Sequence, residues 1–153
     1  MWCISMLPPT VDKAARRTCP MVNRKIRDRT SARLNFYQGC GEQTLTKRVT
    51  ELNREWDTER VLETNAASFV LIASLLGYKK SHCCCFLMTG TVGFFLLQHA
   101  MQGWCPPLPV IRRLGVRTAE EIYQEKTVIK FMRGDFLHHT KCAEEILNAA
   151  EKY

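Results

Sequence analysis

The most constraining feature of the sequence is an uncharged apolar run that extends from Cys83 to Trp104. It contains no Asp, Glu, Lys or Arg and is rich in Phe and Leu. A transmembrane helix needs about 20 consecutive, mostly apolar residues to cross a hydrocarbon core of about 30 Å. The run meets that requirement, so it predicts one membrane-spanning helix.

A second apolar run, residues 66–78, lies just before the first one and is short for a complete span. It can be lengthened only backwards, through Asn65, Thr64 and the acidic Glu63, so this end must lie at the membrane interface. Neither run is strongly favoured in lipid by itself. We therefore predict that the two runs insert together as an antiparallel hairpin over residues 65–104, with its turn near Gly77, a residue suited to a helix C-terminus.

The distribution of basic residues predicts how this hairpin is oriented. Twelve of the 22 Lys and Arg residues precede Ala66, two lie in the turn, and eight follow Trp104. Loops rich in Lys and Arg stay in the cytoplasm. We expect a multi-pass protein of the inner membrane with both termini cytoplasmic. The predicted interface anchors are two tryptophans and two arginines: Trp56, Trp104, Arg112 and Arg113.

Three polar side chains fall inside the predicted spans. Folding the hairpin about its turn brings Asn65 to a depth similar to that of Gln98 and His99. Polar side chains in lipid pair across helices, so we expect Asn65 to hydrogen-bond with Gln98 or His99.

Two pairs of small residues are spaced four apart in the spans: Ala73 with Gly77, and Thr89 with Gly93. Small residues at this spacing allow close helix packing in membranes. They predict helix contacts within the hairpin or between two chains in a homodimer.

We expect the segments on both sides of the hairpin to lie in the cytoplasm. Residues 1–42 are strongly basic and predict a flexible segment, because blocks of like charge repel and bury little. In residues 43–64 the apolar positions Leu45, Val49, Leu52 and Trp56 fall on one stripe, which is typical of an amphipathic helix. Residues 105–153 predict a helical tail. The expected fold class is therefore all-α, with amphipathic cytoplasmic helices on both sides of a two-helix transmembrane hairpin.

The stretch GWCPPLPVIRRLGVRT, which follows the second apolar run, carries a family resemblance. It is similar to the YgaP-like family of small bacterial inner-membrane domains of unknown function, which also form the membrane tail of a membrane-bound rhodanese. The matching positions are Gly103, Trp104, Cys105, Pro106, Leu114, Gly115, Val116 and Thr118. The resemblance extends over about residues 52–136. It implies a two-helix membrane hairpin, often dimeric, with both ends inside the cell and no settled activity. The cysteine run Cys83–Cys85 and residues after Phe136 depart from the family pattern.

Few residues in the sequence are candidates for catalysis or metal binding. Cys105 is the candidate thiol, although an apolar packing role suits it as well. Consecutive cysteines on a helix point about 100° apart, so Cys83–Cys85 cannot converge on one metal. His138, His139 and Cys142 are too few for a closed zinc site. We expect no metal and no cofactor, and the sequence favours a protein without catalytic activity while leaving that question open.

Three functions remain compatible with the sequence. The first is an accessory membrane protein that anchors or binds an unidentified protein partner, or forms an oligomeric conduit for a solute. The second is a thiol-dependent step in sulfur or redox metabolism that uses Cys105. The third is a soluble basic helical protein that binds nucleic acid. The lipid bilayer and a second copy of the chain are the expected partners, and nucleic acid is not expected.

Overall fold

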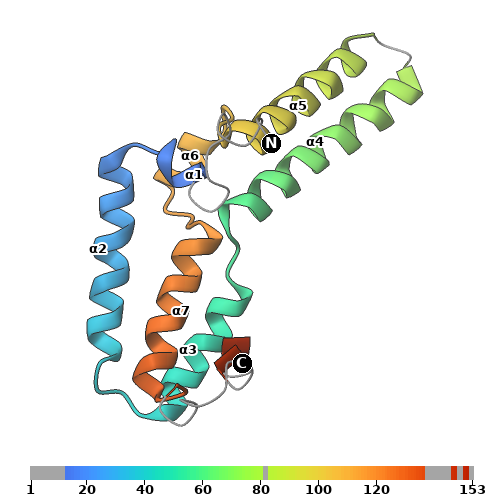
Figure 1. The fold of residues 1–153 in the computed structure, drawn as a ribbon. Helices are drawn as coiled ribbons and strands as arrows, with labels where there is room; N and C mark the ends of the chain where they lie inside the picture. The colour runs from blue at the N-terminus through green and yellow to red at the C-terminus, as the bar shows by residue number, and fades with distance from the viewer. Residues whose placement is uncertain (1–12, 81–82, 137–145, 148–149, 152–153) are drawn as a thin grey trace, which may run out of the picture. The chain divides into compact units, whose positions relative to one another are not determined.

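The computed structural model describes residues 13–80, 83–136, 146–147 and 150–151, and their regular secondary structure consists of helices, without strands (Figure 1). Its helices are α1 (Lys13–Arg16), α2 (Pro20–Tyr37), α3 (Glu42–Arg54), α4 (Thr58–Lys80), α5 (Cys83–Gln102), α6 (Leu108–Arg113) and α7 (Ala119–Arg133). The chain divides into two compact units. The hairpin unit comprises residues 1–23 and 56–118, and the helical unit comprises residues 24–55 and 119–153.

Helices α4 and α5 lie antiparallel and side by side, as the predicted hairpin requires (Figure 1). Among the described residues, two helical stretches are long and apolar enough to cross a membrane: one ends at Tyr78 and the other is Cys84–Gln102. Only 17% and 6% of their apolar windows are buried within the chain. The core helix of a water-soluble protein would be mostly buried, so these helices suit a lipid environment. The all-α fold with an apolar hairpin is confirmed.

The two hairpin helices approach closely near the turn. A Cβ atom added to Gly77 would lie 3.2 Å from Cβ of Cys85 and 3.7 Å from the ring of Phe86. Gly93, in contrast, would place a Cβ atom in open space. The small residue at position 77 therefore belongs to the contact within the hairpin, whereas Gly93 faces away from that contact.

The base of the hairpin has its own small apolar core. It consists of Ala14 from α1, Leu62 from α4, Cys105 from the loop after α5, and Leu108 and Ile111 from α6. These residues bring the start of α4, the end of α5 and the proline-rich segment together. The core thereby closes the open end of the hairpin.

The helical unit has a separate core. The stripe Leu45, Val49 and Leu52 of α3 packs on Ile122 and Ile129 of α7. Leu34, Tyr37 and Cys40, at and after the end of α2, pack against this cluster. Glu125 of α7 is buried and accepts hydrogen bonds from Arg33, at 3.1 Å, and from Nη2 of Arg48, at 2.9 Å. Side-chain hydrogen bonds and the charge of Glu125 outweigh the cost of burial and raise the pKa of Arg48.

The structure corrects the predicted single helix over residues 43–64. Helix α3 ends at Arg54 because Glu55 is extended, and a new helix begins at Thr58. Asp57 starts this second helix, since its Oδ1 accepts a hydrogen bond of 2.7 Å from the backbone N–H of Arg60. Residues 58–64 therefore belong to the hairpin. Trp56 lies between the two helices and packs against Arg60, whose guanidinium is 4.6 Å from its ring centroid.

The predicted flexible segment 1–42 is also corrected for its described part. Residues 13–16 and 20–37 are helical, with Ala14 and Ile26 buried. Ion pairing and packing with distant residues offset the charge repulsion that the local sequence suggested. Residues 1–12 lie outside the described part of the chain.

The predicted helical tail is partly described. Helices α6 and α7 occupy it, and Gly115 and Gly134, with φ of 91° and 86°, follow them in the left-handed conformation that favours glycine. Residues 146–147 and 150–151 are helical, and Nζ of Lys130 donates to the carbonyl of Ala150 at 2.6 Å.

Candidate functional site

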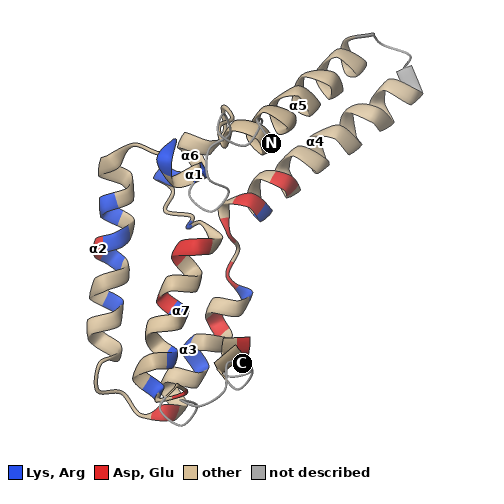
Figure 2. Cartoon of the chain, in the orientation of Figure 1, with Lys and Arg blue, Asp and Glu red and all other residues tan. Residues whose placement is uncertain are grey.

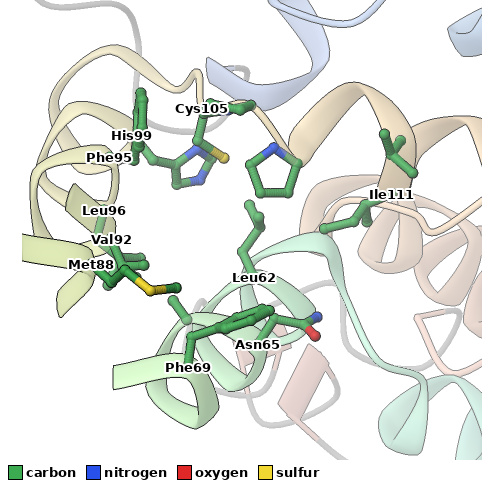
Figure 3. Close-up of a pocket in the computed structure, with 14 residues that line it drawn as sticks. Leu62, Asn65, Phe69, Met88, Val92, Phe95, Leu96, His99, Cys105 and Ile111 are labelled. Atoms are coloured by element: carbon green, nitrogen blue, oxygen red, sulfur yellow. The ribbon is translucent and has the colours of Figure 1, made fainter. Parts of the chain in front are cut away.

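A pocket of about 540 Å³ lies in the hairpin unit between α4, α5 and the segment that follows α5 (Figure 3). The walls are largely apolar side chains, among them Phe69 of α4 and Val92 and Phe95 of α5. Three lining residues carry polar side-chain atoms: Asn65, His99 and Cys105. Asp, Glu, Lys and Arg are absent from the lining that the structure describes.

His99 is the least satisfied group of this pocket. It is 7% exposed, and both ring nitrogens are buried without a hydrogen-bond partner among the described residues. Its ring points toward the pocket, near Cys105 in the view of Figure 3. A buried polar atom without a partner costs free energy, so such groups are uncommon in folded proteins.

The predicted hydrogen bond between Asn65 and His99 is therefore absent from the structure. Nδ2 of Asn65 donates instead to the carbonyl of Val61 on its own helix, at 2.7 Å. The carbonyl four residues earlier lies within reach of a short polar side chain, so the local bond forms instead of the bond across the hairpin. Gln98 is half-buried and lies outside the pocket lining.

Cys105 is placed where it packs rather than reacts. It is 4% exposed, a member of the apolar core at the hairpin base, and a free thiol. Burial raises the pKa of this thiol, and a hydrogen bond from the backbone of Leu108 acts in the opposite direction with smaller effect. The thiolate is the reactive form of cysteine. Burial of Cys105 therefore disfavours the form of the thiol that would react.

The structure shows why the first position of the Gly-Trp-Cys-Pro motif, residue 103, is a glycine. Its φ is 72°, a left-handed conformation that side chains rarely adopt, and a Cβ atom there would lie 2.6 Å from Cβ of Lys13 and 2.8 Å from its backbone carbon. Glycine allows the chain to leave α5 and to pass directly against α1. This turn brings Cys105 to the pocket.

Arg112, predicted to be an anchor at the membrane interface, is fully buried instead. Its guanidinium donates to Oδ1 of Asn23 and to the carbonyl of Val116, each at 2.9 Å, and to Oγ1 of Thr18 at 3.3 Å. Buried guanidinium groups are stable only when their donors are paired, and the loop around Val116 together with the start of α2 provides the acceptors. Arg113 is exposed, as an anchor requires.

With this geometry in view, the comparison with protein families is informative. Residues 57–121 match the family model described as "Inner membrane protein YgaP-like, transmembrane domain". This segment is similar to the YgaP-like transmembrane domain. No curated protein and no solved structure matches the chain. The match and the two apolar helices together support a location in the membrane.

The matched segment contains all of the residues that line the pocket. The match begins at Asp57, next to the start of α4, and ends in the first turn of α7. Thr18 and Asn23, the partners of Arg112, lie before the matched residues. Thr18 and Asn23 therefore contact the matched segment through Arg112.

The remaining predicted site residues are the interface anchor Trp104, the small residues Ala73 and Thr89, and the candidate metal ligands. Trp104 is partly exposed at the end of α5, as an interface anchor requires, and Ala73 is half-buried. The hydroxyl of Thr89 donates to the carbonyl of Cys85 at 3.0 Å. Among the described residues, no group of three or more potential metal ligands occurs, and His138, His139 and Cys142 lie outside them.

No sequence pattern singled out Thr18 and Asn23, which pair with Arg112. The same is true of Thr58, whose hydroxyl donates to the carbonyl of Arg117. Their contacts join positions far apart in the chain, which a local pattern does not reveal. The pocket was missed for the same reason, although its unpaired polar residue, His99, stood out as an ionisable group inside an apolar run.

Proposed function

We propose that the chain is an accessory inner-membrane protein that holds a folded helical unit at the cytoplasmic face of the membrane. The observation that carries this proposal is the separation of charge along the chain. Figure 2 shows Lys, Arg, Asp and Glu in the helical unit and at the base of α4, whereas residues 64–78 of α4 and all of α5 carry none. Lys79 and Lys80 are the last two residues of α4. Such a chain is suited to anchor a charged module to lipid.

The orientation with both termini inside is part of this proposal. Arg16, Arg17 and Arg113 are exposed near the hairpin base, where they suit the anionic surface of the inner leaflet. The opposite end of the hairpin has only Lys79 and Lys80 in the sequence. The difference favours a cytoplasmic base.

The rival functions are less well supported. A thiol-dependent reaction at Cys105 would have to act through a buried thiol whose pKa is raised. A soluble nucleic-acid-binding protein would have to expose Phe94, Leu97 and their neighbours on α5 to water. A homodimer or a solute conduit would use these same outward faces of the hairpin, so the anchor proposal is compatible with either.

The orientation is tested with single-cysteine variants in intact cells. One variant retains only Cys84, which is exposed near the turn, and the other retains only Cys19, which is exposed near the base. A membrane-impermeant maleimide should label the Cys84 variant in intact cells and the Cys19 variant only after the cells are opened. Labelling of both residues from the same side would contradict the hairpin orientation.

Anchoring is tested by washing the membranes. High salt should leave the chain in the membrane fraction, and detergent should release it. Release by salt alone would instead support a peripheral protein bound through its basic residues.

A further inference from the structure

The unpaired ring of His99 is the starting point for an inference about a ligand. The side chain is more than nine-tenths buried, yet neither nitrogen has a partner among the described residues. A neutral imidazole carries one donor and one acceptor. His99 is one of the residues that line the pocket, so a bound molecule with a suitable polar atom would supply a partner that the ring lacks within the described part of the chain.

The pocket limits the chemistry of that molecule. Its volume of about 540 Å³ falls within the range of about 300–1,000 Å³ that is typical of small-molecule sites. Phe69, Met88 and Phe95 provide apolar walls, and the described lining contains no charged side chain of Asp, Glu, Lys or Arg. A charged ligand would lose its hydration without gaining a counter-ion. The favoured ligand is therefore uncharged and mostly apolar.

The position of the pocket indicates where the ligand comes from. Helices α4 and α5, the two membrane-spanning candidates, contribute most of the lining, while residues 105–107 and α6 close the remaining side. A molecule dissolved in the bilayer can reach such a site laterally. Asn65 and His99 lie among apolar side chains in it, an arrangement that orients one polar group of a ligand.

We propose that this pocket binds a neutral, lipid-soluble molecule that carries a carbonyl or hydroxyl oxygen on an apolar body, and that His99 hydrogen-bonds to this oxygen. An isoprenoid quinone and a neutral glycerolipid such as a diacylglycerol share this chemistry. The site is independent of the anchoring role, because a membrane anchor needs no ligand and no pocket.

The proposal is tested with the full chain purified in dodecyl maltoside. Decylubiquinone and dioleoylglycerol are titrated separately, and binding is followed by native mass spectrometry and by the nitrogen NMR shifts of the His99 ring. The variant His99→Phe keeps an aromatic ring but removes both hydrogen-bonding atoms. Loss of one buried hydrogen bond should weaken binding about threefold to tenfold.

Two further variants separate the ligand site from general effects on the fold. Gln98→Leu removes a neighbouring polar side chain that lies outside the lining and should bind like the wild type. Val92→Trp fills the pocket and should abolish binding while the hairpin retains its helical circular dichroism. His99→Gln retains a donor and an acceptor and should restore part of the affinity if His99→Phe loses it.

The two probes also distinguish the sources of the ligand. Saturable, His99-dependent binding of decylubiquinone or of dioleoylglycerol supports the proposal and identifies the ligand class. Failure of both probes to bind, equal binding by wild type and His99→Phe, or unchanged binding by Val92→Trp would overturn it. None of these results bears on the maleimide test of the hairpin orientation.

Discussion

Thr58 is joined to the carbonyl oxygen of Arg117 by two hydrogen bonds, one from its backbone N–H at 2.8 Å and one from its hydroxyl at 2.9 Å. Thr58 is fully buried. The first residue of α4 is thereby tied to the segment that precedes α7, 59 positions away in the chain. This contact explains why a helix that looks continuous in sequence is interrupted before the hairpin.

Replacement of Thr58 by Val should destabilise the hairpin unit by about 1 kcal/mol, because a buried hydroxyl hydrogen bond is lost while the shape is kept. The measurement is thermal unfolding in detergent, followed by circular dichroism. The control is Thr50→Val, since Thr50 is exposed on α3 and bonds only to the carbonyl of Thr46 in its own helix. Equal effects of the two substitutions would show that the Thr58 contact is unimportant.

Arg112→Lys should destabilise the chain by about 2 kcal/mol or more, because lysine cannot reproduce the fork that reaches both Asn23 and Val116. Thr18 and Asn23 should be held less firmly, and trypsin should cut faster after Arg16 and Arg17. Arg113→Lys is the matched control, since Arg113 is exposed, and it should change stability by no more than about 0.5 kcal/mol. A lipid-anchoring role for Arg112 would predict similar, small effects for both.

The two glycines of the hairpin should respond differently to leucine. Gly77→Leu should destabilise the hairpin by about 1–3 kcal/mol, because the new side chain meets Cys85 and Phe86. Gly93→Leu should be tolerated within one chain, since a Cβ atom there has no neighbour within 4 Å. Helix propensity favours leucine over glycine in both variants, so it cancels in the comparison. A drop in chemical cross-linking for Gly93→Leu alone would place this face in a homodimer.

The thiol of Cys105 should react slowly with iodoacetamide at pH 7 and faster as the pH is raised. Its pKa is raised by burial, so the thiolate fraction at neutral pH is lower than that of an ordinary cysteine, whose pKa is about 8.5. Labelling followed by peptide mass spectrometry should modify the exposed Cys19 first. Rapid modification of Cys105 at pH 7 would favour the thiol-dependent function.

The same shift predicts a small loss of stability in alkali. The folded chain holds this thiol neutral more strongly than the unfolded chain does. The associated stability is therefore present below the unfolded pKa and is lost as the pH rises through the folded pKa. Cys105→Ala should remove this part of the alkaline dependence, and an unchanged profile would argue against it.

A charge on the outer face of α5 should oppose membrane insertion. Phe94→Arg places arginine in the span, at a cost of about 2.5–3.5 kcal/mol near the helix centre, and should shift the chain toward the soluble or aggregated fraction. Phe131→Arg is the control, because Phe131 is similarly exposed but lies on α7 outside the hairpin. Fractionation of cell membranes and immunoblotting measure both, and equal partitioning would contradict a spanning α5.

Part of the site was predictable from the sequence. The length and lack of charge of residues 83–104 are local properties that already imply a span, and the prolines after Trp104 indicate where the helix must end. His99 could be singled out as an ionisable group in an apolar run. Its environment could not, because the pocket is made by α4, α5 and α6 together.

The sequence by itself determined that this chain is helical and that two of its helices belong in lipid, because hydrophobic length and charge distribution act within each segment. Only the tertiary structure decided that Arg112 is buried, that the N-terminal segment is helical in its described part, and that Asn65 bonds within its own helix. These outcomes depend on which distant donors and acceptors meet, such as Arg112 with Asn23. A buried charge is tolerated only where the fold brings its partners to it.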